Sequence, residues 1–230
     1  MCDNAAVTGV TFDGGYAEYA LLRDEAVVRV PKEMDVAEVA PLLCAGVTVF
    51  NGIRKMKIEQ GNIVAVLGVG GLGHLAVQYA SRMGYKTVVI SSGDAKRQLS
   101  QELGAHEYID SSKADPAKKL ADMGGVALVV ATAPNGKTIS SLIGGLQAGG
   151  KILILAIAGN IEFNTVQMIT KGLSVSGWPS GHALDVEEAI EFAHNQGVKC
   201  RVEKFPMAEA AKATDVMTSG KVRFRSVLMM

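Results

Sequence analysis

The chain of 230 residues is long enough to bury a substantial core, and this length predicts one domain, or one domain with part of another. Its 23 basic and 23 acidic residues balance, without a long run of one sign, which argues against a nucleic acid or a membrane surface as a partner. The longest apolar run, at 152–158, is too short to span a bilayer.

The N-terminus, MCDNAAVTGV, lacks the basic segment and the apolar core of a signal peptide. Three cysteines, Cys2, Cys44 and Cys200, are too few for a disulfide framework. We therefore expect a cytoplasmic protein.

The first 60 residues predict a strand followed by two helices. The sequence Asp-Gly-Gly at 13–15 is a turn pattern, and the alternating segment 16–22 after it predicts a strand. Asp35 is a helix-capping residue, and apolar residues at helical spacing follow it to position 43. A second helix is predicted to end near Met56.

Residues 62–92 carry the pattern on which the rest of the prediction depends. A Val-rich strand at 62–67 precedes a glycine turn, a helix at 72–83 follows it, and 86–90 is a second apolar strand. The glycines of the turn are Gly68, Gly70 and Gly73, in the spacing G-x-G-x-x-G, with Gly71 in addition. Such a turn lets the backbone approach a pyrophosphate at the N-terminus of the helix. We therefore predict a dinucleotide site, the alternative being an ordinary βαβ crossover.

Helical and strand patterns continue to alternate after Ser92. Asp94 is predicted to cap a helix that ends near Leu103. Further strands are predicted at 108–109, 126–131, 152–157 and 173–175, with helices at 116–123 and 138–146 between them. This alternation predicts an α/β fold with a doubly wound parallel sheet covered by helices on both faces. The helical stretch 186–195 and the basic tail 221–230 are expected to lie outside this sheet.

Several segments together resemble the zinc-type medium-chain alcohol dehydrogenase family, in particular its cinnamyl-alcohol-like and yeast-like branches. They are DGGYAEY at 13–19, PLLCAGVTVF at 41–50, GVGGLGHLAVQYA at 68–80, MGYK at 83–86, GLQAGGKILIL at 145–155 and SGKVRFRSVL at 219–228. The resemblance implies part of a GroES-like, β-rich catalytic domain in residues 1–45 and a Rossmann dinucleotide-binding domain in 46–177. Residues 178–230 would return to the catalytic domain.

The resemblance implies a zinc site. Cys44 would be a ligand of the catalytic zinc, and Cys2 would be a remnant of the structural zinc lobe. The alternative for Cys44 is a small buried residue, since free cysteines are usually inert. The segment that supplies the other catalytic ligands is absent, and no histidine lies in a pattern that replaces them. We therefore expect that the chain lacks the N-terminal part of the catalytic domain.

The end of the second strand of the dinucleotide unit predicts the cofactor. A site for NAD has an acidic residue there, which accepts a hydrogen bond from the ribose 2′-hydroxyl. This chain has Ser91 and Ser92, followed by Lys96 and Arg97. Hydroxyls and cations without a carboxylate favour the 2′-phosphate of NADP over NAD. The alternative is that Lys96 and Arg97 only solvate a helix face.

Other cofactor contacts are implied by the resemblance. Thr48 would lie against the nicotinamide, and Arg225 would reach the pyrophosphate, the alternative being a surface cation beside Arg223. The remaining residues expected at the cofactor are Leu72 in the glycine turn and Thr132, Ala156 and Ser176 near strand ends.

The sequence thus predicts an NADP(H)-dependent oxidoreductase that interconverts small alcohols and aldehydes by hydride transfer, with zinc polarising the carbonyl. The resemblance also implies a homodimer or homotetramer, with the last sheet strand, near 173–176, pairing between subunits. One alternative is a truncated, catalytically inactive dinucleotide-binding module. Another is a zinc-free quinone or enone reductase, against which Cys44 argues.

Overall fold

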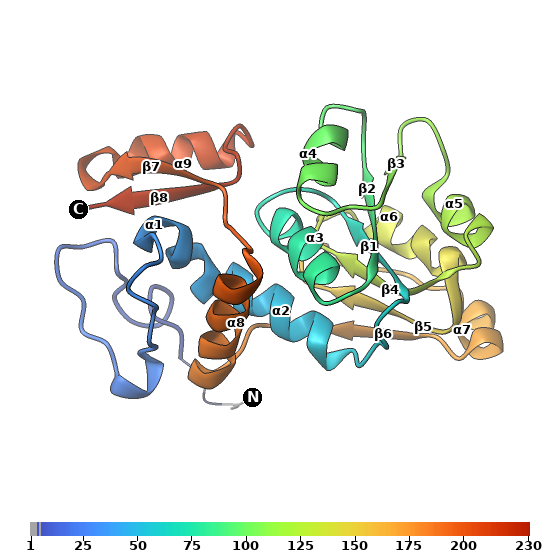
Figure 1. Cartoon of the computed structure of the whole chain (residues 1–230), viewed down its shortest axis with the longest axis horizontal. Helices are drawn as coiled ribbons and strands as arrows, with labels where there is room; N and C mark the ends of the chain where they lie inside the picture. The colour runs from blue at the N-terminus through green and yellow to red at the C-terminus, as the bar shows by residue number, and fades with distance from the viewer. Residues whose placement is uncertain (1–3, 5) are drawn as a thin grey trace.

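The computed structural model describes residue 4 and residues 6–230, and its main feature is a six-stranded, all-parallel sheet (Figure 1). The strands are β1 (Ile63–Leu67), β2 (Lys86–Ser91), β3 (Glu107–Asp110), β4 (Val126–Ala131), β5 (Leu146–Ile154) and β6 (Ser174–Gly177). Their order in the sheet is β3-β2-β1-β4-β5-β6. The chain winds outward from β1 in one direction and then from β4 in the other, so the predicted doubly wound fold is confirmed.

Helices connect these strands and flank the sheet. The α-helices are α1 (Val36–Val39), α2 (Ala45–Lys55), α3 (Gly73–Arg82), α4 (Arg97–Glu102), α5 (Pro116–Asp122), α6 (Gly136–Ser141), α7 (Thr165–Lys171), α8 (Ala183–Gln196) and α9 (Ala210–Thr218). Short 3-10 helices span Asp24–Ala26, Ala40–Leu43, Leu142–Gly145 and Met207–Glu209. The predicted cap of α1 is confirmed, because the Asp35 carboxylate accepts from the Ala37 amide at 2.9 Å.

Two cores lie on opposite faces of the sheet, because successive residues of a strand point to opposite sides. In β1, Val64 and Val66 belong to the core shared with α2, α3 and α8, whereas Ala65 and Leu67 belong to the core under α5 and α6. Both faces are therefore apolar. This arrangement explains why the central strands read as continuous hydrophobic runs in the sequence.

The C-terminal part forms a separate two-stranded parallel sheet of β7 (Val202–Pro206) and β8 (Arg225–Met229), with α9 between them in the chain. In Figure 1 the small sheet lies at the upper left and the large sheet at the right, with α2 and α8 in the lower middle. The expectation that the tail lies outside the main sheet is confirmed. The ion pair of Lys204 and Asp35, at 2.8 Å, joins β7 to the cap of α1.

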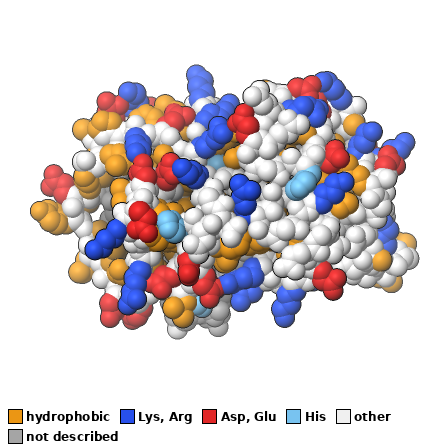
Figure 2. All heavy atoms as spheres, in the orientation of Figure 1, with side chains coloured by type: hydrophobic (Ala, Val, Ile, Leu, Met, Phe, Trp, Pro, Cys, Tyr) orange, Lys and Arg blue, Asp and Glu red, His pale blue; other side chains and the backbone are white. Residues whose placement is uncertain are grey.

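The strand predicted at 16–22 is wrong: this segment is irregular and exposed. Tyr19 is 90% exposed and Leu21 is 98% exposed, and orange side chains gather at this end of the molecule in Figure 2. A strand forms only where a neighbour supplies backbone partners. In the described part of 1–45, the sole pairing is an isolated bridge of Thr8 and Phe12, and Cys2 lies outside the described residues.

Within residue 4 and residues 6–230, no single helix is long and apolar enough to cross a membrane. The pair Val36–Leu43 and Ala45–Lys55 reaches the required length and composition together but is bent by 50°.

Leu128 provides a test of the core, because its side chain is fully buried in the centre of β4. We expect Leu128→Ala to lower the free energy of unfolding by about 2 to 5 kcal/mol, measured by urea denaturation. Leu184→Ala is the matched control, since Leu184 is 65% exposed on α8, and we expect a change within about 0.5 kcal/mol. Equal losses in the two variants would contradict the assignment of the core.

Candidate dinucleotide-binding site

The glycine turn brings the N-terminus of α3 against the end of β1. Gly68 has φ of +91°, a conformation that favours glycine. A Cβ on Gly73 would lie 2.0 Å from the carbonyl oxygen of Gly68, so no larger residue fits there. A Cβ on Gly70, by contrast, would meet no atom within 4 Å. The turn is therefore packed at Gly73 and open at Gly70.

The N-terminus of α3 offers backbone amides to an anion. The His74 amide donates to the Gly70 carbonyl at 3.0 Å, and the Ala76 amide donates to the Leu72 carbonyl at 2.9 Å. Leu72 is the N-cap of α3 and Gly73 its first residue, and Gly71 directly precedes them. Amides at the start of a helix have no intrahelical partners. Leu72 would thus contact the cofactor through its backbone amide, a donor that a phosphate oxygen can accept from.

Arg225 of β8 lies directly against this turn. A Cβ on Gly71 would come within 2.7 Å of the Arg225 guanidinium carbon, so the absence of a side chain at Gly71 makes room for the arginine. The Nε of Arg225 is buried and has no hydrogen-bond partner among the described residues. A buried, unpaired donor beside free helix amides fits the pyrophosphate of a dinucleotide.

Asp110, which lies beside the end of β2 on the neighbouring strand, uses its carboxylate for hydrogen bonds to the loops around it. Asp110 pairs with Ser91 across β2 and β3, and its carboxylate accepts from the Gly93 amide at 2.8 Å. It also accepts from the Ser112 amide and hydroxyl, at 2.9 and 2.6 Å. The hydrogen bonds from Ser112 hold the pKa of Asp110 well below its usual range. Asp110 therefore shapes the loop after β2 as a structural carboxylate.

The two predicted cations after β2 differ in the structure. Arg97 donates to the Asp94 carboxylate at 2.8 and 3.0 Å and lies over the Tyr108 ring at 4.6 Å. Asp94, predicted to cap this helix, instead forms ion pairs with Arg97 and Lys113, so that prediction is wrong. Arg97 is thus used to hold the loop.

Lys96 is half-buried and belongs to no ion pair in the described part of the chain. Burial lowers its pKa, and the charge of Arg223 lowers it further. An anion is favourable near cations that repel each other in this way. The Glu203 carboxylate close by accepts from the backbone amide of Arg223 at 2.7 Å. Ser91 is half-buried and Ser92 exposed at the same end of β2.

Cys44 and Arg225 line one cavity of about 360 Å³, together with Tyr16, Pro41, Met207 and Met230 among others. The Cys44 thiol is free and exposed, so the alternative of a buried small residue does not hold. The cavity therefore extends from Cys44, the predicted zinc ligand, to Arg225 on the pyrophosphate side of the cofactor site. Its walls come from the N-terminal segment, α2 and β8.

The hydroxyls predicted near the nicotinamide are both engaged with backbone. Thr48 is buried in α2 and donates to the carbonyls of Cys44, at 2.7 Å, and Pro179, at 3.2 Å. Thr132 donates to the Leu67 carbonyl at 2.8 Å and so ties the end of β4 to the end of β1. Ala156 and Ser176 are half-buried, Ala156 just beyond the end of β5 and Ser176 near the end of β6. All lie toward the carboxyl edge of the sheet, where ligands bind in this fold.

The described residues do not fit a catalytic zinc. Nowhere among them do three His, Cys, Asp or Glu side chains lie close enough together to hold a metal ion. A catalytic zinc needs three protein ligands and an open position. Cys44 therefore has no co-ligands in this part of the chain, and Cys2 lies outside it.

His74 is the site residue that the sequence analysis missed. Its ring is fully buried, lies 2.9 Å from the Gly70 carbonyl through Nδ1, and accepts from the Arg201 amide at 3.2 Å through Nε2. The ring also stacks on Phe224 with centroids 4.8 Å apart. Burial lowers the pKa of His74 to about 4, and the charges of Arg225 and Arg201 contribute. Its only sequence mark is its place directly after the glycine turn.

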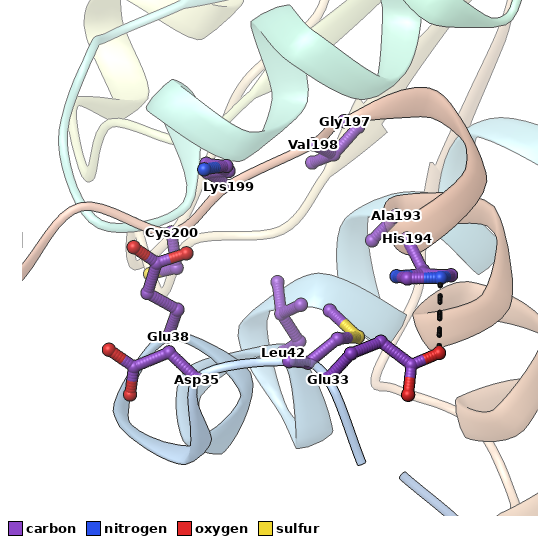
Figure 3. Close-up of a pocket in the computed structure, with 11 residues that line it drawn as sticks. Glu33, Asp35, Glu38, Leu42, Ala193, His194, Gly197, Val198, Lys199 and Cys200 are labelled. Atoms are coloured by element: carbon purple, nitrogen blue, oxygen red, sulfur yellow. Dashed lines mark ion pairs between the residues drawn. The ribbon is translucent and has the colours of Figure 1, made fainter. Parts of the chain in front are cut away.

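A second cavity, of about 280 Å³, lies where the end of α8 faces α1 and the 3-10 helix after it (Figure 3). Its polar lining includes Glu33, Asp35, Glu38, His194 and Lys199, and His194 pairs with Glu33 at 3.6 Å. None of the predicted cofactor residues lines it. We assign the cofactor to the glycine turn and its neighbours instead.

The glycine turn predicts opposite outcomes for two substitutions. Gly70→Ala places a methyl group in open space, so we expect normal folding and loss of dinucleotide binding. Gly73→Ala drives a methyl group into the Gly68 carbonyl, so we expect unfolding to become easier by about 2 kcal/mol or more without any ligand. Thermal unfolding and fluorescence titration with a reduced nicotinamide dinucleotide measure the two effects. A Gly70→Ala variant that binds normally would contradict this site.

The buried His74 predicts a pH-dependent stability. Between pH 6.5 and about 4 the unfolded chain binds a proton at His74 that the folded chain does not. The free energy of unfolding should therefore fall as the pH falls through this window, by roughly 3 kcal/mol from this residue. Comparison of urea denaturation at several pH values for the wild type and His74→Phe isolates the contribution. Parallel pH curves for the two proteins would refute it.

Comparisons with known proteins identify the family of the chain. The profile of a family described as zinc-binding dehydrogenase matches residues 71–195. An alcohol dehydrogenase of Aspergillus sp. (strain MF297-2) is 51% identical over the whole of this chain, which covers 68% of that protein. The crystal structure of the alcohol dehydrogenase of the archaeon Aeropyrum pernix superposes with a TM-score of 0.90 at 27% identity, covering 100% of this chain and 69% of that one. A cinnamyl alcohol dehydrogenase of Sorghum bicolor gives a TM-score of 0.87 at 31% identity, over 96% of this chain and 63% of that one. The chain therefore belongs to the zinc-type alcohol dehydrogenase family of oxidoreductases, whose members use NAD(P) and zinc.

Proposed function

We propose that the chain is an NADP(H)-dependent dehydrogenase that interconverts small alcohols and aldehydes by hydride transfer. The observation that carries the cofactor choice is the end of β2, where Ser91 and Ser92 stand in place of an acidic residue. Lys96, with its pKa lowered by burial and by Arg223, supplies positive charge beside these hydroxyls. A 2′-phosphate would accept from the hydroxyls and relieve the repulsion between the two cations.

The same structure refines the roles of the predicted cations. Arg97 already donates to Asp94 and lies over Tyr108, so its removal would disturb the loop as well as any ligand. Lys96 has no such partner among the described residues. We therefore assign the 2′-phosphate to Ser91, Ser92 and Lys96, with Arg97 as the residue that supports their loop.

The rest of the cofactor follows the carboxyl edge of the sheet. The pyrophosphate would accept from the α3 amides and from Arg225, and the nicotinamide would lie beyond Thr132 and Ala156. The bound cofactor supplies or takes the hydride. The chain's own part is to bind and orient it, because Thr132 fixes the end of β4 and Arg225 fixes the phosphates.

Three further proposals concern the substrate, the oligomeric state and the cellular location. The substrate is a small alcohol or aldehyde that reaches the nicotinamide through the cavity beside Cys44. A second copy of the chain pairs along β6, which is an outer strand of the sheet, to give a homodimer or homotetramer. The protein acts in the cytoplasm, as its cysteine content suggests.

A second candidate function is a dinucleotide-binding module without chemistry of its own. The observation that favours it is the lack of three metal donors near Cys44 in the described residues. The two candidates share the cofactor site and differ in turnover. Cys44 argues against a zinc-free quinone or enone reductase only as a zinc ligand, and its co-ligands are not among the described residues.

Cofactor preference and turnover can be tested in one experiment. We expect the protein to reduce NADP⁺ in preference to NAD⁺ with a panel of primary alcohols, followed by the absorbance of the reduced cofactor. Ser91→Asp should reverse the preference, because a carboxylate repels the 2′-phosphate and accepts from the 2′-hydroxyl of NAD. Thr165→Asp, at the exposed start of α7 and outside the predicted cofactor residues, is the control for added charge.

Unchanged selectivity in Ser91→Asp would contradict the NADP assignment. Tight NADPH binding without turnover, in protein that carries no zinc by metal analysis, would favour the binding module.

A further inference from the structure

We infer that His74 is a positioning residue for the cofactor pyrophosphate. It fixes the position of the glycine turn relative to Arg225, so that both can contact the same phosphates. This inference rests on the proposed NADP(H) binding. It concerns the phosphate end of that site, and no role for His74 follows from the hydride chemistry. The observations that carry it are the contacts of the ring on three sides.

The contacts form a closed circuit around one buried ring. Nδ1 bonds to the Gly70 carbonyl at 2.9 Å, and Nε2 accepts from the Arg201 amide at 3.2 Å. The Arg201 carbonyl in turn accepts from the Phe224 amide at 3.0 Å, and the Phe224 ring stacks on His74. Arg225 is the next residue, and its guanidinium lies at Gly71. One side chain thus spans the turn and the residue before the arginine.

The circuit requires a neutral imidazole with one specific tautomer. Nδ1 must carry the proton to donate to Gly70, and Nε2 must be free to accept from Arg201. The charged groups that face the ring are Arg225 and Arg201, and both disfavour a second proton. No other neutral side chain offers a donor and an acceptor on opposite edges of a flat, stackable ring.

Gln78, one turn further along α3, also binds the segment around residue 200. It therefore allows two roles of His74 to be distinguished: positioning of the phosphate site, and mere attachment of this segment to α3. Its amide nitrogen donates to the Lys199 carbonyl at 2.9 Å, and its oxygen accepts from the Lys199 amide at 3.0 Å. Figure 3 labels Lys199 and Cys200 on the segment that leads toward Arg201. This segment is therefore held to α3 at two places. Of the two, only His74 also contacts the glycine turn and Phe224.

The test compares ligands that do and do not reach the glycine turn. NADPH and ADP-ribose carry a pyrophosphate, whereas 2′-AMP has a 2′-phosphate and no 5′-phosphate. We expect His74→Phe, which keeps a stackable ring, to weaken NADPH and ADP-ribose binding by about tenfold or more while 2′-AMP binding stays within about threefold of wild type. The matched control Gln78→Leu removes the Lys199 contacts and should change all three affinities by less than about threefold. Calorimetric titration measures each constant.

Two further variants secure the interpretation. His74→Asn retains a donor toward Gly70 without the Nε2 acceptor and should show an intermediate loss, which also serves if His74→Phe fails to fold. Arg225→Gln should weaken NADPH by itself, and addition of His74→Asn to it should cost less than in the wild type, because the two act on one phosphate site.

Equal affinity for NADPH in wild type and both His74 variants would overturn the inference. A His74 variant that loses affinity for NADPH and for 2′-AMP by the same factor would also overturn it. Losses in Gln78→Leu as large as those in His74→Phe would assign His74 to docking alone. A wild-type protein that binds none of the three ligands would overturn the proposed function itself.

Discussion

The close approach of α3 to the end of β1 is the constraint on which the site depends. With only 2.0 Å between the carbonyl oxygen of Gly68 and a Cβ built on Gly73, the helix can occupy this position only if residue 73 has no side chain. The approach directs the first amides of α3 toward the carboxyl edge of the sheet. Beside this contact, the absence of a side chain at Gly71 makes room for Arg225.

Much of the fold could be predicted from the sequence because its determinants are local. The buried strands around Val66 and Val129 are continuous apolar runs, which is typical of a parallel sheet covered on both faces. The glycine turn could be recognised because Gly68, Gly71 and Gly73 each lie where a side chain would clash, while Gly70 faces open space. The strand expected at 16–22 failed for the opposite reason, since alternation indicates a face but does not supply the neighbour that a strand requires.

The site was less predictable, because its side chains compete for partners that only the fold brings together. Local sequence favours Asp94 as a helix cap, but Arg97 and the more distant Lys113 offer it stronger, charge-assisted bonds. Arg97 is thereby removed from the set of free cations, and Lys96 is left. His74 and Arg201 lie 127 residues apart, so no local pattern could connect them. Arg225 came from family resemblance and not from any periodicity.

The contacts of His74 join segments that the ribosome synthesises at different times. The glycine turn belongs to the first strand-helix unit of the large sheet, whereas Arg225 begins the second strand of the small sheet and Phe224 directly precedes it. On the ribosome the chain grows from its N-terminus, so the turn emerges long before its arginine. The large sheet can form before the phosphate site is complete. Cofactor capture therefore becomes a late event in synthesis, because the cation of the phosphate site emerges only with β8.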